Sequence, residues 1–281
     1  MNAETLTSPT LTSCSSPSDS TLAEESVKLK RVLLTGSGGF LGQHLTSRLR
    51  QSFALRVLDV TPDVRPSTGE KAASVEVMEG SVADSALVEQ AVDGMDALVI
   101  AHMAPNRPEV YGAVDLPFSI NVQGTAALLH AAAKRGVKRV VLVSSTTVVD
   151  GSRMSGAFMD KDTKPSPSSM YSLTKALQEE IARYFHHTHG MEIAVLRPAY
   201  VILEDPLKDK YGRTPKSVNW QFIDPRDIAE AAALALVKPG IEFEIFYTLA
   251  GPGSEKRADL GNLKQLLGWQ PRYKFEQYPV D

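Results

Sequence analysis

The sequence has one cysteine, no apolar run long enough to cross a membrane and no stretch rich in lysine and arginine. A single cysteine, Cys14, excludes a disulfide framework within one chain and a metal site made of several cysteines. A membrane helix needs roughly 20 consecutive apolar residues. The 30 basic and 33 acidic residues nearly cancel, to a formal net charge of -3. We therefore expect neither membrane nor nucleic acid as a partner, and a reducing, cytoplasmic location.

The first 28 residues have little apolar content and no arginine, and they are rich in Ser, Thr and Pro. They lack the apolar core of a secretion signal and the arginines of a transit peptide. Such a segment cannot bury enough apolar surface to fold. We predict a disordered tail over residues 1–28, either a dispensable extension or a site of regulatory phosphorylation. We predict that residues 29–281 form a single folded domain.

From residue 30, short apolar runs alternate with helical patterns. The runs favour strands over residues 31–34, 55–59, 75–78, 97–100, 140–143 and 193–196. Helices are predicted over residues 40–50, 85–92, 120–134 and 169–189. Continuous apolar runs, separated by helices, are typical of a parallel sheet that is covered on both faces. This predicts an α/β fold, a Rossmann-type doubly wound parallel sheet.

The pattern loosens after Pro198, where a loop is predicted up to Gln221. A helix over residues 225–238, a strand over 245–249 and a short helix over 260–267 follow. We assign residues of about 198–221 and 240–281 to a small C-terminal substrate-binding region.

Three glycines follow the first predicted strand at the spacing Gly-x-x-Gly-x-x-Gly, namely Gly36, Gly39 and Gly42. In a dinucleotide-binding loop the first permits the turn, the second admits a pyrophosphate and the third lets helix and strand pack closely. Phe40 and Leu41 begin the helix whose positive end then faces the phosphates. The flanking strand and helix make this motif specific for a dinucleotide.

Asp59 ends the second predicted strand. An acid at this spacing hydrogen-bonds the hydroxyls of the adenosine ribose. Because a carboxylate repels a 2′-phosphate, Asp59 favours NAD over NADP.

Tyr171 and Lys175 lie four residues apart at the start of the second long helix, and therefore on one face of it. A free tyrosine has a pKa near 10, and we expect the adjacent ammonium to lower it. Tyr171 would then exchange a proton with an alcohol or a carbonyl group. Ser145 follows the fifth predicted strand and is expected to hydrogen-bond the reacting oxygen.

Together these residues resemble the extended short-chain dehydrogenase/reductase family, also called the NAD-dependent epimerase/dehydratase family, over about residues 30–270. Further matches lie at residues 121–125, 197–198, 222–228 and 267–271. The resemblance implies hydride transfer at NAD with Ser145, Tyr171 and Lys175 as the catalytic triad. It also implies a homodimer formed by helices over about residues 112–135 and 169–189. The remaining cofactor contacts that it implies are Val60, Ser81, Val82, Ala101, Met103 and Asn121, the last of which also supports the active-site helix.

Among compact members of the family, the chain resembles those that oxidise C1 of a uronic acid to a lactone. The likeness lies in Tyr211-Gly212-Arg213, in Trp220 and in the Leu-Gly-Trp sequence near the end. It places the substrate against Ser145, Thr146, Thr147, Tyr200 and Arg213. Arg213 would bind the sugar carboxylate, because its planar guanidinium suits bidentate pairing.

Thr146, Thr147 and Tyr200 depart from the subfamily pattern, so another small sugar, a polyol or a hydroxy acid stays open as the substrate. The short stretch between Arg197 and Asp224 leaves little room for a lobe that grips a sugar nucleotide.

Two other functions stay open. The chain could be an NAD-retaining epimerase or dehydratase, or a nucleotide sensor without catalysis, although sensors usually lose the tyrosine and the lysine. His186, His187 and His189 cluster at a helix end, where imidazole suits the helix dipole, and we expect no metal there. His102 is expected to be structural.

Overall fold

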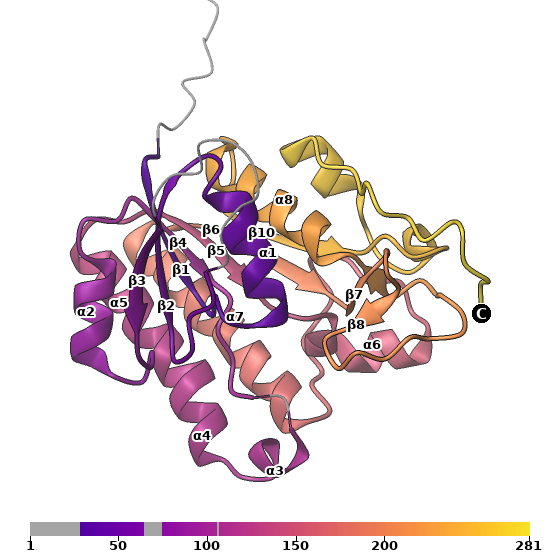
Figure 1. Cartoon of the computed structure of the whole chain (residues 1–281), viewed down its shortest axis with the longest axis horizontal. Coiled ribbons are helices and arrows are strands. Elements are labelled where there is room, and N and C mark those ends of the chain that lie inside the picture. Colours follow the sequence, from indigo (N-terminus) through magenta and orange to yellow (C-terminus); the bar gives the residue numbers. More distant parts are fainter. Residues whose placement is uncertain (1–28, 65–74, 106) are drawn as a thin grey trace, which may run out of the picture.

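The computed structural model describes residues 29–64, 75–105 and 107–281 (Figure 1). The predicted tail over residues 1–28 lies outside the described residues. A seven-stranded parallel sheet forms the centre of the described part, in the order β10-β6-β5-β4-β1-β2-β3. Its strands are β1 (Arg31–Thr35), β2 (Ala54–Asp59), β3 (Val75–Glu79), β4 (Ala97–Ile100), β5 (Arg139–Val143), β6 (Glu192–Pro198) and β10 (Phe243–Thr248). This order is doubly wound and reverses between β1 and β4, which is where ligands bind in such sheets. The predicted fold class is confirmed.

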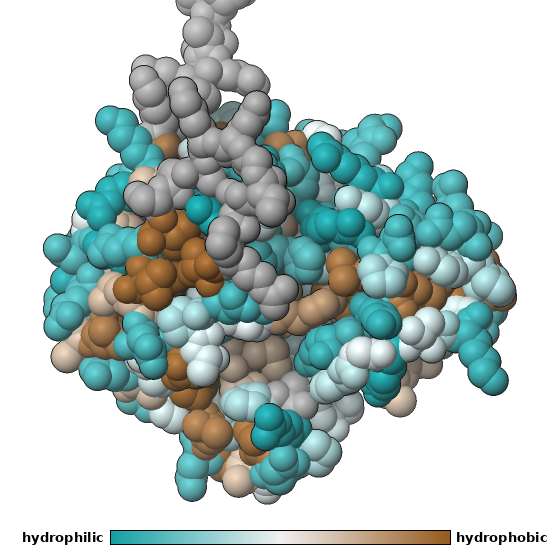
Figure 2. All heavy atoms as spheres, in the orientation of Figure 1, coloured by the Kyte–Doolittle hydropathy of each residue, from teal (hydrophilic) through white to brown (hydrophobic). Residues whose placement is uncertain are grey.

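Helices cover both faces of the sheet. One face carries α2 (Ser85–Val92), α5 (Gly124–Lys134) and α7 (Met170–His189), and the other carries α1 (Phe40–Leu49) and α8 (Pro225–Val237). The middle of each central strand is a continuous apolar run because both faces of the sheet are buried, and Val32, Leu33 and Leu34 of β1 are each 0% exposed. Burying one such side chain contributes roughly 1.5–3 kcal/mol. Figure 2 shows hydrophilic side chains over most of the face in view, with hydrophobic groups in small patches between them.

Local signals set the bounds of α7, the longest helix of the described part. Ser169 and Ser172 form a reciprocal capping box at its start. Gly190 ends it in the left-handed conformation that glycine adopts without penalty. None of the helices in the described ranges has the length and apolarity of a membrane span.

The loop predicted up to Gln221 is wrong in part. β7 (Tyr200–Leu203), β8 (Lys208–Asp209) and β9 (Phe222–Ile223) form a second, three-stranded sheet, beside the C-terminal segment in Figure 1. Two of these strands have two residues, too few for a periodic pattern. The predicted helix over residues 120–134 begins with a wider turn, η1 (Phe118–Gln123), before α5. The remaining short elements are α3 (Pro108–Tyr111), α4 (Asp115–Pro117), η2 (Thr146–Val149), α6 (Asp150–Ser155), η3 (Ser254–Lys256) and η4 (Leu263–Leu267).

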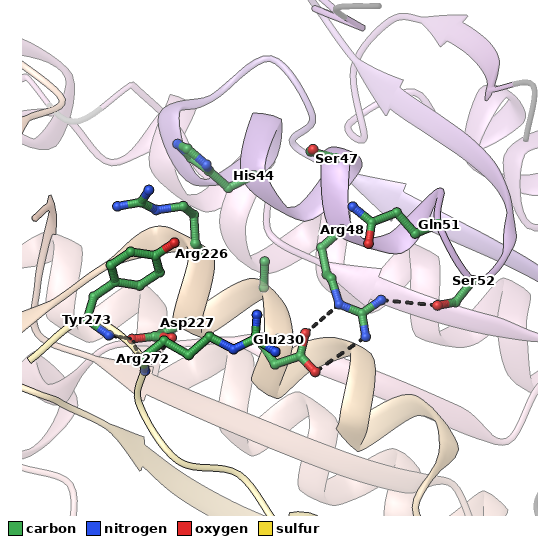
Figure 3. A pocket seen from close by; sticks show the side chains of 11 residues that line it. His44, Ser47, Arg48, Gln51, Ser52, Arg226, Asp227, Glu230, Arg272 and Tyr273 are labelled. Atoms are coloured by element: carbon green, nitrogen blue, oxygen red, sulfur yellow. Dashed lines mark hydrogen bonds and ion pairs between the residues drawn. The ribbon is translucent and has the colours of Figure 1, made fainter. Parts of the chain in front are cut away.

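A polar cavity of about 600 Å³ lies between α1, α8 and the C-terminal segment (Figure 3). Two of its three arginines are paired within the fold, because Arg48 pairs with Glu230 at 2.5 Å and Arg226 pairs with Asp224 at 2.7 Å. Asp227 accepts hydrogen bonds from the backbone N–H groups of residues 272 and 273 and so holds the C-terminal segment. None of the predicted site residues lines this cavity.

Candidate active site

Most of the predicted site residues meet in a second cavity, of about 870 Å³. It lies at the carboxyl ends of β1, β4, β5 and β6, where the strand order reverses. The predicted residues that line it are Gly36, Gly39, Phe40, Leu41, Gly42, Ala101, Met103, Ser145, Thr147, Tyr171, Lys175, Tyr200 and Arg213. Residues that are far apart in the sequence thus form one continuous wall.

The glycine loop has the shape of a phosphate cradle. A Cβ on Gly42 would lie 1.9 Å from the carbonyl oxygen of Gly36, so only glycine lets α1 approach β1 this closely. Gly39 is open, because a Cβ there would meet only Gly36, at 3.6 Å. Gly39 also caps α1, whose first turn has no acidic residue and no side-chain cap. The positive end of α1 therefore faces the cavity, as pyrophosphate binding requires.

Asp59 supports the glycine loop from the end of β2. Its carboxylate accepts hydrogen bonds from the N–H groups of Gly38 (3.0 Å) and Thr61 (2.8 Å). Asp59 does not line the cavity itself, nor do the other residues expected at the adenosine end, which are Val60, Ser81 and Val82. Val60 is 56% exposed, whereas Val82 is buried.

Ser145, Tyr171 and Lys175 lie together beside the cradle. The hydroxyl of Tyr171 is hydrogen-bonded to Ser145, whose Oγ accepts from the N–H and hydroxyl of Thr147, at 3.2 and 2.9 Å. The ammonium of Lys175 donates to the carbonyl oxygen of Val143, at 2.8 Å. The hydroxyl groups of α7 and of the turn after β5 thus converge on one point of the cavity.

The predicted lowering of the tyrosine pKa is wrong for this structure. Burial raises the pKa of Tyr171 to about 12, because a phenolate loses its hydration there. Burial also lowers the pKa of Lys175 to about 8. The lysine points to the backbone of β5 rather than to the phenol, so its charge does not offset the desolvation.

Asn121 and Thr146 do not line the cavity. Asn121 is fully buried, accepts from the N–H of Ala104 (2.7 Å), and donates to the hydroxyls of Thr174 (2.9 Å) and Tyr111 (3.2 Å). It therefore ties α7 to the segment after β4. Thr146 is 1% exposed.

Sequence reasoning missed Tyr111, which packs against Tyr171. The two rings meet edge to face, with centroids 5.6 Å apart. The hydroxyl of Tyr111 donates to the carbonyl oxygen of Ala104 (3.1 Å). Tyr111 lies in α3, a single turn with no periodic pattern, so no sequence signal pointed to it.

A buried ion pair holds the elements that carry the candidate catalytic residues. Glu179 of α7 binds Arg197 of β6 at 2.6 Å, and each side chain is 1% exposed. Glu179 also accepts from Ser144 (2.5 Å), and Arg197 donates to the hydroxyl of Tyr247 on β10 (2.8 Å). Because Ser144 precedes Ser145 and Glu179 lies on the helix of Tyr171, this network fixes their relative position.

His102 follows β4 and lies beside Gly36 of the glycine loop. Burial lowers the pKa of His102 to about 3, so the ring is neutral, and it is hydrogen-bonded to Thr35 at 2.9 Å. His102 is thus structural, as predicted. Among the described residues, no three His, Cys, Asp or Glu side chains are grouped as a metal site would require.

Relatives of known activity share much of this chain. A Haloferax volcanii protein named NAD-dependent glucose-6-phosphate dehydrogenase is 27% identical over 89% of this chain and 98% of its own. The uronate dehydrogenase of Pseudomonas syringae pv. tomato is 32% identical over 59% of this chain, which spans 58% of that protein. The crystal structure of uronate dehydrogenase from Agrobacterium tumefaciens has the same fold, with a TM-score of 0.68, 21% identity and coverage of 86% of this chain and 84% of that one.

The family model described as "NAD dependent epimerase/dehydratase family" matches residues 32–245. This match runs from the first strand of the central sheet into its last strand. The match confirms NAD as the expected cofactor. The chain belongs to the NAD-dependent epimerase/dehydratase family.

Proposed function

We propose that this protein is an NAD-dependent dehydrogenase that oxidises a CH–OH group of a small sugar, and that its substrate is a uronic acid, oxidised at C1 to the lactone. The observation that carries this proposal is a single cavity that joins the glycine loop to Ser145, Tyr171 and Lys175. Relatives that oxidise uronates and a sugar phosphate support a sugar as the substrate.

Three side chains divide the chemistry in this proposal. Bound NAD supplies the hydride acceptor. Ser145, held by Thr147, hydrogen-bonds the reacting oxygen, and Tyr171 takes the hydroxyl proton while the C1 hydride leaves. Tyr171 accepts this proton as the phenolate and is left as the neutral phenol, while the ammonium of Lys175 lies on the same face of α7 and lines the same cavity. Of the candidate cofactor residues, Gly36, Gly39 and Gly42 would hold the pyrophosphate, and Asp59 the adenosine ribose.

The rate of oxidation should rise with pH. Below the Tyr171 pKa of about 12, the phenolate fraction grows roughly tenfold per pH unit. Above about pH 8 Lys175 loses its charge, so the rise in kcat/KM should flatten there. The profile is measured from pH 6 to 10 in the wild type and in Lys175→Met, which should lack the inflection. A flat wild-type profile would argue against Tyr171 as the base.

The Gly39→Ala variant tests the cradle. The new Cβ has space in the protein itself, so the melting temperature without NAD should stay unchanged. It would project where the backbone approaches the pyrophosphate, so the Kd for NAD should rise about tenfold or more. Calorimetry measures the Kd and a thermal scan provides the control. Unchanged NAD affinity would place the phosphates elsewhere.

We also infer a small substrate lobe, formed by about residues 198–221 and 240–281. A third hydrophobic cluster supports it, made of Ile202, Leu207, Val218, Phe222 and Phe275. This cluster joins the β7–β9 sheet to the C-terminal segment.

We further infer a cytoplasmic homodimer that pairs through α5 and α7. The exposed Leu173 and Tyr184 of α7 (37% and 58%) support such a contact. Light scattering after gel filtration would give the mass in solution, and a monomer at micromolar concentration would refute the dimer.

The experiment that tests the function is NADH absorbance with purified protein, NAD and a panel of glucuronate, galacturonate, neutral sugars and polyols. We expect NADH with the uronates. NADH with neutral alcohols alone would keep the dehydrogenase and discard the uronate. No net NADH, with cofactor retained through gel filtration, would favour the epimerase instead.

A further inference from the structure

Asp209 is the centre of a small network at the substrate end of the cavity. It is 5% exposed and lies on β8, at the start of the turn that carries Tyr211 and Arg213. One carboxylate oxygen accepts from the N–H groups of Tyr211 (2.8 Å) and Arg213 (2.9 Å). The other accepts from the hydroxyl of Tyr200 (2.6 Å) and from Nε of Arg213 (2.7 Å).

These contacts hold Arg213 in one orientation although its side chain is 63% exposed. Nε and one Nη of Arg213 face Asp209, at 2.7 Å each, so only the outer edge of the guanidinium remains for a ligand. The hydrogen bonds that Asp209 accepts lower its pKa to about 2, despite its burial, so it is ionised. Asp209 therefore cancels the charge of Arg213 without blocking its outer edge.

Lys210 brings a second cation to the same place. Its ammonium lies over the ring of Tyr211 at 5.0 Å, and the guanidinium of Arg213 lies over the same ring at 4.6 Å. Tyr211 is near enough to Tyr171 to contribute to the raised pKa of that phenol. The turn over residues 209–213 thus carries one positive charge that Asp209 does not balance, and this turn lies close to Tyr171. Arg107 and Glu109, which also line the cavity, have opposite charges.

We propose that Asp209 determines specificity, by fixing Arg213 and setting the local charge so that the cavity prefers a substrate carboxylate to a phosphate dianion. This inference rests on the proposed function. A carboxylate has one negative charge and two coplanar oxygens, which match the outer edge of a guanidinium. A phosphate monoester carries nearly two negative charges at neutral pH, because its second pKa is about 6. One of these would remain unbalanced beside the buried carboxylate of Asp209.

The test compares kcat/KM for glucuronate with that for glucose 6-phosphate. We expect the wild type to favour glucuronate. Asp209→Asn keeps one oxygen acceptor and removes the charge, so the ratio of glucose 6-phosphate to glucuronate should rise about tenfold or more. Lys210→Gln should lower that ratio, and because Lys210 is exposed this variant should fold normally. Glu255→Gln removes one negative charge, as Asp209→Asn does, but at an exposed residue of η3. It should therefore leave the ratio of glucose 6-phosphate to glucuronate unchanged.

The outcomes separate this inference from the proposed function. If Asp209 has a merely structural role, Asp209→Asn would lower kcat/KM for glucuronate and for glucose 6-phosphate by the same factor. That result, together with an unchanged ratio of the two substrates in Lys210→Gln, would overturn the inference. Absence of NADH with every substrate would refute the proposed function. In that case the Kd values of glucuronate and glucose 6-phosphate, measured by calorimetry with NAD present, would give the preference between the two sugars. A change of that preference in Asp209→Asn would decide the role of Asp209.

Discussion

Replacing Tyr171 with phenylalanine is expected to lower turnover about 10³-fold or more, because the reacting hydroxyl loses its proton acceptor. The ring would keep its edge-to-face contact with Tyr111, so the fold and the NAD site should persist. The Kd for NAD should therefore stay within about threefold of the wild-type value, since the loss concerns the transition state alone. Steady-state rates at saturating NAD and calorimetry measure the two quantities.

Tyr184→Phe is the matched control for this variant. Tyr184 lies on the same helix and is 58% exposed, so loss of its hydroxyl should leave turnover unchanged. Wild-type turnover in Tyr171→Phe would remove Tyr171 from the mechanism. A large loss of NAD affinity in that variant would instead point to a role in binding.

Glu179→Ala is expected to lower the free energy of unfolding by about 3–5 kcal/mol, because it leaves the buried guanidinium of Arg197 without its partner. Arg197 is 1% exposed, and among the described residues only the Tyr247 hydroxyl would still accept a hydrogen bond from its side chain. Ser144 would lose its acceptor as well, which would loosen the turn that carries Ser145. Chemical denaturation followed by circular dichroism measures the loss.

Two further variants serve as controls for Glu179→Ala. Glu180→Ala removes the next acid of α7, whose side chain is 56% exposed and meets Arg183 at 3.6 Å. Such a surface pair contributes about 0–1 kcal/mol. The double variant Glu179→Met with Arg197→Met should recover most of the lost stability, because apolar residues can replace a buried pair. Equal stability of Glu179→Ala and Glu180→Ala would show that the buried network does not hold the fold.

The sequence was informative where one local pattern determines one structure. Two-sided burial makes the centres of β1, β4 and β5 continuous apolar runs, and close backbone contacts require the glycines at 36 and 42. The predicted bounds of α2 and the ends of α7 were also confirmed, since capping residues mark them. The cavity therefore contains the glycine loop, Ser145, Tyr171 and Lys175, as expected.

Features that depend on contacts between distant segments could not be predicted. The pKa of Tyr171 depends on its burial and on the direction in which Lys175 points, and neither follows from the four-residue spacing. Arg213 was expected as a carboxylate ligand, but its pairing with Asp209 and Tyr200 depends on how β7 meets β8. Strands of two residues have no periodicity, so the sheet that creates this pairing left no signal in the sequence.

The most direct test of the proposed function uses glucuronate deuterated at C1. The protein is incubated with this substrate and NAD, and the released cofactor and sugar are analysed by mass spectrometry. Direct oxidation at C1 predicts one deuterium in each reduced cofactor and an equal amount of lactone without deuterium. Sugar that keeps its deuterium, with no reduced cofactor released, would contradict the account.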